Sequence, residues 1–249
     1  MRILKSVVVA AIIALLFSTS GCLPRYGIAN GGGEPIHFTK PVYRDTAVSA
    51  TYVGGKYSHT MDSAYSNRNE SSYFGELYLY RSHTREYYNF SYGAFGYTGK
   101  YKVAVIEQYR GSKGFYGGGV SSEFNLSIPT QFVDLRLVGI RGTLLYETGD
   151  FYSFRKRASK EGLIDNCSYG RMAYNISLSS ELAFKIKNES FGVYGSLGST
   201  ENFSDYHSIF TITCSGYYTH KRITAYIQMT DCYDGIGEVY SLGLNFKIK

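Results

Sequence analysis

The stretch 172-MAYNISLSSELAFKI-186 alternates apolar and polar side chains along most of its length. One set of alternate positions is apolar except for Ser180, and it holds Met172, Tyr174, Ile176, Leu178, Leu182, Phe184 and Ile186. The other set is mostly polar and includes Asn175, Ser177, Ser179, Glu181 and Lys185. Because successive side chains of a β-strand point to opposite faces, this pattern predicts a long strand with one apolar and one polar face.

The same period of two recurs through the rest of the chain. It is clear at 120–128 and at 240–248, and weaker runs bring the number of candidate strands to about twelve. The other runs lie near 37–44, 46–57, 72–82, 86–97, 101–109, 132–147, 190–198, 206–218 and 221–231. A composition with 26 Tyr, 15 Phe and 28 Gly favours strands over helices, since aromatic rings suit a pleated surface. Outside the N-terminal segment, no long stretch has the periodicity of a helix.

The connections between the candidate strands are mostly short. Gly, Ser and charged residues at 83–85, 98–100, 111–113 and 187–189 predict tight turns, and tight turns join antiparallel neighbours. Two connections are longer, at 58–71 and at 149–169. Twelve strands place the 58–71 connection on the side of the short turns, whereas merging two strands near the N-terminus gives ten and moves it to the other side. Both topologies stay open.

Alternation fits a soluble sandwich or a lipocalin-like barrel as well as a barrel in a membrane. Strand length favours the membrane barrel. A strand over 172–186 rises roughly 50 Å, or about 35 Å along the membrane normal at a 45° tilt, which exceeds the roughly 25 Å apolar band of such barrels. In a barrel the polar face turns inward, so Glu123, Arg141, Glu181 and Lys185 are expected to pair across a narrow lumen. Side chains nearly fill a bore of this size, so we do not expect a large pore.

The last residues of the chain resemble the C-terminal β-signal of bacterial outer-membrane barrels. The key positions of that pattern are a polar residue, a glycine and two apolar residues, here Ser241, Gly243, Phe246 and Ile248. The resemblance implies recognition by the outer-membrane assembly machinery. The predicted fold is therefore all-β, an antiparallel meander closed into an outer-membrane-type barrel of about 12 (or 10) strands.

The chain begins as a secretory signal. Arg2 and Lys5 precede an apolar run at 7–17, and small residues follow at 18–21. The run is shorter than the roughly 20 residues of a membrane-spanning helix. The stretch 18–22, Ser-Thr-Ser-Gly-Cys, resembles a bacterial lipobox, which implies cleavage before Cys22 and attachment of lipid, palmitate included, to its thiol. Two or three acyl chains anchor a protein to membrane lipid durably.

These patterns divide the chain into three parts. Residues 1–21 are the lipoprotein signal peptide, residues 22–35 a flexible, lipid-anchored tether, and residues 36–249 the β-barrel domain. Three cysteines remain besides Cys22, and the expected topology puts Cys167 and Cys232 on the same side, which predicts a disulfide between them in an oxidising compartment.

The sequence gives little support for a nucleic-acid, metal or catalytic site. The net charge of +6 is modest and comes without a run of Lys or Arg, so nucleic-acid binding is not indicated. The five histidines and four cysteines have no metal-ligand spacing, and we expect no metal or other cofactor. Asp205, His207 and Ser208 are close in sequence, but adjacent residues of a strand face opposite ways, so they form no nucleophile–base relay. We expect a protein that is not an enzyme. The cations of 155–160 are interpreted as part of a solvated loop.

We expect a lipid-anchored outer-membrane β-barrel with a structural, interaction or narrow-channel role. Its partners are membrane lipid and the assembly machinery. The alternative is a soluble all-β lipoprotein, a sandwich or a lipocalin-like barrel, that binds a ligand or partner in the periplasm or at the cell surface.

Overall fold

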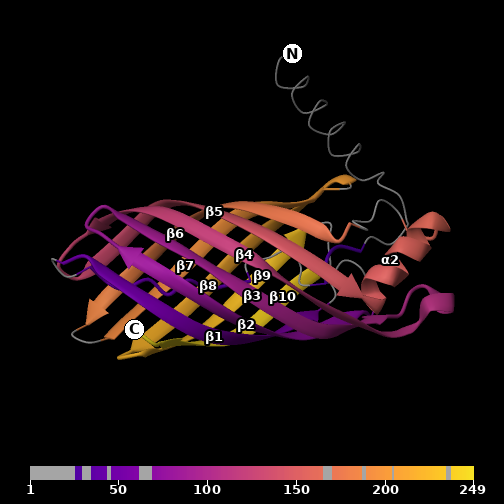
Figure 1. The fold of residues 1–249 in the computed structure, drawn as a ribbon, viewed down its shortest axis with the longest axis horizontal. Coiled ribbons are helices and arrows are strands. Elements are labelled where there is room, and N and C mark those ends of the chain that lie inside the picture. Colours follow the sequence, from indigo (N-terminus) through magenta and orange to yellow (C-terminus); the bar gives the residue numbers. More distant parts are fainter. Residues whose placement is uncertain are drawn as a thin grey trace, which may run out of the picture.

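The computed structural model describes residues 26–29, 35–43, 46–61, 69–164, 170–186, 189–203, 205–233 and 237–249. Ten antiparallel strands follow one another in chain order, and β1 also pairs with β10, so the sheet closes into a barrel (Figure 1). The strands are β1 (Val48–Met61), β2 (Ser71–Thr84), β3 (Tyr88–Val103), β4 (Gly111–Pro129), β5 (Val133–Gly149), β6 (Met172–Ile186), β7 (Glu189–Asn202), β8 (Asp205–His220), β9 (Ile223–Tyr233) and β10 (Gly237–Lys247). The described residues also form a short 3₁₀ helix, η1 (Glu107–Tyr109), and an α-helix, α2 (Asp150–Lys160).

The predicted antiparallel meander is confirmed, and of the two strand counts ten is correct. Two of the twelve candidate strands are absent. Residues 37–43 form no strand, and the run at 101–109 is the end of β3 followed by η1. Gly99 suggested a turn, yet it lies within β3, where a Cβ would come 2.3 Å from the Tyr73 carbonyl oxygen. That glycine allows neighbouring strands to approach closely, and so does not mark a reversal of the chain.

The two ends of the barrel differ. At the short-turn end the strands are joined by residues 85–87, 130–132, 187–188 and 221–222, and the Lys249 carbonyl accepts a hydrogen bond from the Thr51 amide at 2.9 Å. At the other end, the long-loop end, longer connections join β1 to β2, β3 to β4 and β5 to β6, while β7–β8 and β9–β10 are joined by short ones (Figure 1). The 62–70 connection therefore shares an end with α2, as the ten-strand topology predicts.

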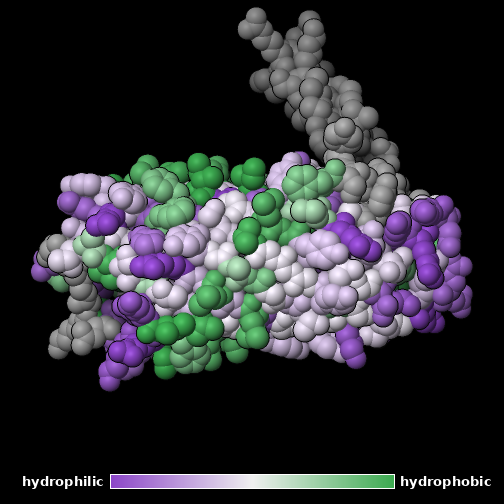
Figure 2. Space-filling view, in the orientation of Figure 1, coloured by the Kyte–Doolittle hydropathy of each residue, from purple (hydrophilic) through white to green (hydrophobic). Residues whose placement is uncertain are grey.

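The outer wall of the barrel is apolar. All ten strands carry large apolar side chains that are exposed, and one outward row crosses five strands in register. The row consists of Phe124, Ile140, Leu178, Leu197 and Ile212. In Figure 2 the hydrophobic side chains gather over the middle of the wall and the hydrophilic ones gather toward both ends, α2 included. A two-layer sandwich with an apolar interior is therefore not what the described residues form.

The helix α2 was not predicted. It begins after Gly149, which has φ of +117°, and it has Asp150 in its first turn and Lys160 in its last, both favourable to the helix dipole. Phe151, Phe154 and Ala158 are buried along one side. Three apolar positions over eleven residues are too few to stand out as helical periodicity against the surrounding loop.

No helix among the described residues is both long and apolar enough to cross a membrane.

Candidate functional site

The lumen is filled by the chain's own residues 35–43, which we call the plug. Residues 35–40 are buried and residues 41–43 half-buried. Side chains of the barrel wall satisfy the backbone of the plug. Arg141 Nη1 donates to the Ile36 carbonyl at 2.9 Å, Asn245 Nδ2 to the His37 carbonyl at 3.0 Å, and the Thr39 amide donates to the Tyr80 hydroxyl at 2.9 Å. The plug thus takes its hydrogen bonds from side chains, whereas a strand would take them from a neighbouring backbone. Pro41, which has no amide hydrogen, suits this arrangement.

A buried charge cluster holds the plug to the wall. It contains three cations and three carboxylates, which are Lys40, Arg136, Arg141, Glu123, Glu181 and Asp134. Lys40 comes from the plug, and its Nζ lies 3.0 Å from Glu123 Oε1 and 2.9 Å from Glu181 Oε2. Each of these carboxylates also has an arginine partner on the wall, Arg141 at 2.5 Å for Glu123 and Arg136 for Glu181. The charges balance only when the plug is in place.

The prediction that Glu123, Arg141 and Glu181 face inward and pair is confirmed, and Glu123 and Arg141 are direct cross-strand neighbours. Lys185 was also expected to pair with a charge across the lumen, but it lies at the rim of the short-turn end. There its Nζ donates to the Tyr43 and Thr130 carbonyls at 3.1 and 2.9 Å. Lys40 was missed, since residues 37–44 were expected to form a strand. Pro41 and the weak alternation of that run were the available signals against a strand.

Aromatic rings surround the plug beside the charge cluster. The His37 ring stacks on Tyr226 with centroids 4.5 Å apart and lies 5.2 Å from Tyr217. The Tyr226 hydroxyl is 2.7 Å from the Tyr78 hydroxyl, which donates to Asn245 Oδ1 at 2.7 Å. The same Asn245 side chain bonds the plug, so ring stacking and hydrogen bonding lock one side of the plug to β2, β9 and β10.

The C-terminal motif residues have separate places in this arrangement. Ser241 and Gly243 face the lumen, and the Ser241 hydroxyl is 2.8 Å from that of Ser58 on β1. Phe246 and Ile248 are exposed on the outside. A Cβ on Gly243 would lie 2.2 Å from Tyr226 Cζ, so the glycine makes room for the ring on which His37 stacks. Whether these residues also act as an assembly signal is a proposal taken up below.

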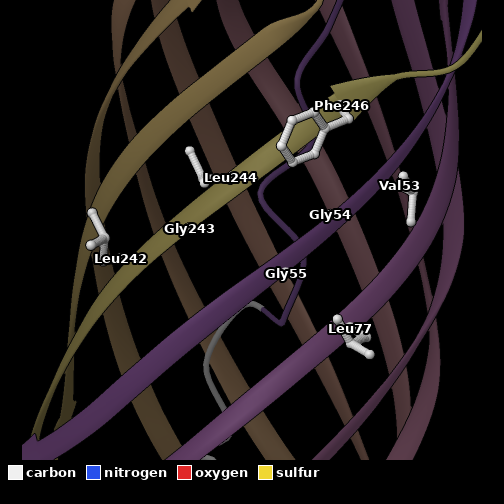
Figure 3. Close-up of a pocket in the computed structure, with 8 residues that line it drawn as sticks. All are labelled: Val53, Gly54, Gly55, Leu77, Leu242, Gly243, Leu244 and Phe246. Atoms are coloured by element: carbon white, nitrogen blue, oxygen red, sulfur yellow. The ribbon is translucent and has the colours of Figure 1, made fainter.

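The seam between β1 and β10 is hollowed on its outer side. Figure 3 shows bare backbone at the glycines of both strands, bordered by apolar side chains. The hollow has a volume of about 430 Å³ and is lined by Val53, Gly54, Gly55, Leu77, Leu242, Gly243, Leu244 and Phe246. With this lining, the hollow is an apolar depression of the outer wall and has no polar side chains that would orient a specific ligand.

Substituting Gly243 with Ala is expected to destabilise the barrel by about 1–3 kcal/mol, the usual cost of an overpacked site. The new methyl group collides with Tyr226, which His37 and Tyr78 hold in place. The measurement is the temperature at which purified, folded protein in detergent converts to the unfolded form on a denaturing gel. In a Tyr226→Ala background the same substitution should cost much less, because the ring is gone. An equal loss in both backgrounds would contradict the packing role.

An aromatic cap closes the long-loop end. We define the cap as Tyr26, Tyr101, Phe151 and Phe154, whose rings meet at centroid distances from 4.3 to 6.3 Å. Glu70 accepts hydrogen bonds from the Tyr26 hydroxyl at 2.8 Å and the Tyr101 hydroxyl at 3.1 Å. The cap therefore joins the N-terminal segment to β3 and α2.

Charged groups reinforce the cap. The Ala29 amide donates to Glu147 Oε2 at 2.8 Å, and the same carboxylate pairs with Arg155 of α2, both side chains being buried. Residues 26–29 belong to the stretch expected to be a flexible tether, and they are buried instead. Arg155 belongs to the cationic stretch at 155–160, of which Lys156, Arg157 and Lys160 remain exposed.

The η1 turn is tied to the residue that follows α2. The Tyr109 hydroxyl donates to Glu161 Oε1 at 2.9 Å, and this hydrogen bond to a carboxylate raises the pKa of the Tyr109 phenol. The neutral phenol is the donor, so the contact persists at neutral pH.

Several predicted residues lie outside the described part of the chain. These are the signal peptide, Cys22 and Cys167. Cys232 is described and buried in β9. The Cys167–Cys232 disulfide and the acylation of Cys22 therefore stay predictions. Among the described residues, no three or more His, Cys, Asp or Glu side chains are grouped so as to hold a metal ion.

Solved structures similar to this chain are bacterial outer-membrane barrels. The β domain of the Bordetella autotransporter BrkA is 14% identical with a TM-score of 0.45, the match covering 80% of this chain and 99% of that one. An outer membrane channel from Pseudomonas putida F1 is 11% identical with a TM-score of 0.39, covering 84% and 97%. The translocator domain of the autotransporter NalP from Neisseria meningitidis is 7% identical with a TM-score of 0.38, covering 82% and 89%. No family model and no curated protein matches the sequence. These likenesses concern the fold alone.

Proposed function

We propose that this protein is a lipid-anchored outer-membrane β-barrel whose lumen is closed by its own plug, and that its role is structural or interactive. The observation that carries the proposal is the distribution of polarity across the wall. Exposed apolar side chains lie on the outer face of all ten strands, while the inside holds buried charges and hydroxyls together with aromatic rings. Soluble monomers rarely expose more than a few hundred Å² of contiguous apolar surface. Hydrocarbon is the environment that suits this outer face.

The soluble alternative fits less well. A lipocalin-like barrel encloses a ligand in a cavity, whereas this lumen holds residues 35–40 and a charge cluster with side chains at most 2% exposed. A conducting channel is also disfavoured while the plug stays in place. We therefore favour a closed barrel, and conduction becomes a property that appears when the plug is released.

The outer membrane is the proposed location, and two features of the chain support it. Bacterial barrels have short periplasmic turns and longer external loops, and the three longest connections of this barrel share one end. The pattern at Ser241, Gly243, Phe246 and Ile248 adds the proposed contact with the assembly machinery, and membrane lipid is the other proposed partner. We propose no catalytic role, because the sequence holds no spacing of residues that is typical of a catalytic or metal site.

The test is the electrophoretic behaviour of the Cys22→Ser variant, which has no acyl anchor. A membrane barrel should require detergent for solubility even without lipid, and unboiled samples should migrate differently from boiled ones on a denaturing gel. In planar bilayers the wild-type protein should insert and stay closed. A Cys22→Ser protein that is soluble in water without detergent would overturn the membrane assignment.

A further inference from the structure

The N-terminal segment comprises the described residues 26–29 and 35–43, and these extend from one end of the barrel to the other. Tyr26 lies at the long-loop end, packed edge-on against Phe154 of α2 with centroids 5.2 Å apart. Tyr43 lies at the short-turn end, where its carbonyl accepts from Lys185 Nζ at 3.1 Å. Between these points, Ile36 and Lys40 contact the wall in the lumen.

The attachment at the long-loop end is extensive. Tyr26 is 1% exposed and Ala29 is fully buried. Tyr26 bonds Glu70 through its hydroxyl, and Ala29 bonds Glu147 through its amide, each at 2.8 Å. A segment that merely hung beside the barrel would have neither burial nor two carboxylate partners on the wall. Residues 26–29 are thus built into this end of the molecule.

The attachment at the short-turn end fixes the direction of the segment. The Pro41 carbonyl accepts from the hydroxyl of Thr84, the last residue of β2, at 2.8 Å. The chain then enters β1 at Val48, which pairs with Thr84 at the same end. The segment therefore enters at the long-loop end, passes through the lumen and leaves at the short-turn end to start the barrel.

We infer that Cys22 lies on the outer side of the membrane and that its acyl chains enter the outer leaflet, so that the anchor is displayed at the cell surface. The inference rests on the proposed function, which places the long loops outside. Cys22 precedes Tyr26 by four residues, a span of at most about 14 Å for an extended chain. That reach is far too short to return through the barrel to the short-turn end, since β3 alone has 16 residues and rises roughly 50 Å.

The test is epitope accessibility in a Gram-negative host that expresses the full chain. One variant carries a short epitope between Pro24 and Arg25. Two matched controls carry the same epitope after α2, between Gly162 and Leu163, and in the β8–β9 turn, between Lys221 and Arg222. We expect antibody to bind intact cells with the first two insertions, and to bind the third only after the outer membrane is permeabilised. Labelled palmitate should be incorporated by each variant and lost after Cys22→Ser.

The outcomes separate the inference from the proposed function. If the 24/25 epitope needs permeabilisation while the 162/163 epitope does not, the barrel stands and the surface anchor is wrong. If both the 162/163 and the 221/222 epitopes are inaccessible on intact cells, the proposed outer-membrane orientation fails as well. Palmitate that persists in Cys22→Ser would also overturn the inference, because the lipid would then be attached elsewhere.

Discussion

Replacing Lys40 with Met is expected to release the plug and open the lumen to ions. The substitution keeps an apolar stem but removes the cation that lies within 3.0 Å of both Glu123 and Glu181. Removing one partner of a buried ion pair typically costs about 3–5 kcal/mol, because the remaining charge is left uncompensated. Release of the plug lets water reach these carboxylates, so displacement becomes the favourable response. Planar-bilayer recording should show openings in the variant where the wild-type protein is closed.

The charge balance predicts more than conduction. Without Lys40 the lumen keeps Arg136 and Arg141 against three carboxylates, so the opened pore should prefer cations. The unfolding temperature of the purified barrel in detergent should fall as well. Lys40→Arg, which keeps the charge, and Lys156→Met, which removes an exposed cation of α2 away from the plug, serve as controls and should remain closed. A Lys40→Met protein with wild-type stability and no conductance would show that the ion pairs do not retain the plug.

Substitution of Leu178 with Arg should severely impair insertion into the bilayer. Leu178 is 58% exposed near the middle of β6 and is flanked in register by Ile140 on β5 and Leu197 on β7. An arginine on the lipid face of a barrel costs about 2–4 kcal/mol at the bilayer midplane and about 0–1 near the interface. The measurement is the fraction folded after dilution from denaturant into lipid vesicles, read from the gel shift between boiled and unboiled samples.

Thr98→Arg is the matched control for Leu178→Arg. Thr98 is exposed on the outer face of β3, and its outward neighbours on the strand are Gly96 and Lys100. Thr98 lies toward the long-loop end of β3, and its cross-strand neighbours are Gly75 and Tyr116. An arginine there is expected near the interface, where its cost is small, so the variant should fold nearly as well as the wild type. Equal folding of both variants in vesicles, or folding of Leu178→Arg in plain buffer, would contradict the membrane-facing wall and favour the soluble alternative.

By itself, the sequence determined that the chain forms long strands and the direction in which their side chains point. The alternation of β6 and of β10 could be read directly, since the period of two is a property of neighbouring residues. The same alternation placed Glu123, Arg141 and Glu181 on the inner face, and the structure confirms that they pair there. Face assignment needs no knowledge of distant contacts, which explains why it succeeded.

The strand count, the plug and the cap depended on the tertiary structure. The sequence could not show that Gly99 belongs to a strand and not to a turn. The reason for a glycine there is the close approach of the Tyr73 carbonyl on β2, which is a contact between distant parts of the chain. Lys40 finds its partners 83 and 141 residues further along the chain, and those partners share one space only after ten strands have closed. The cap likewise brings Tyr26 to Phe154 of α2. A lumen exists only once β1 meets β10, so no local pattern in residues 37–43 could specify what they would fill.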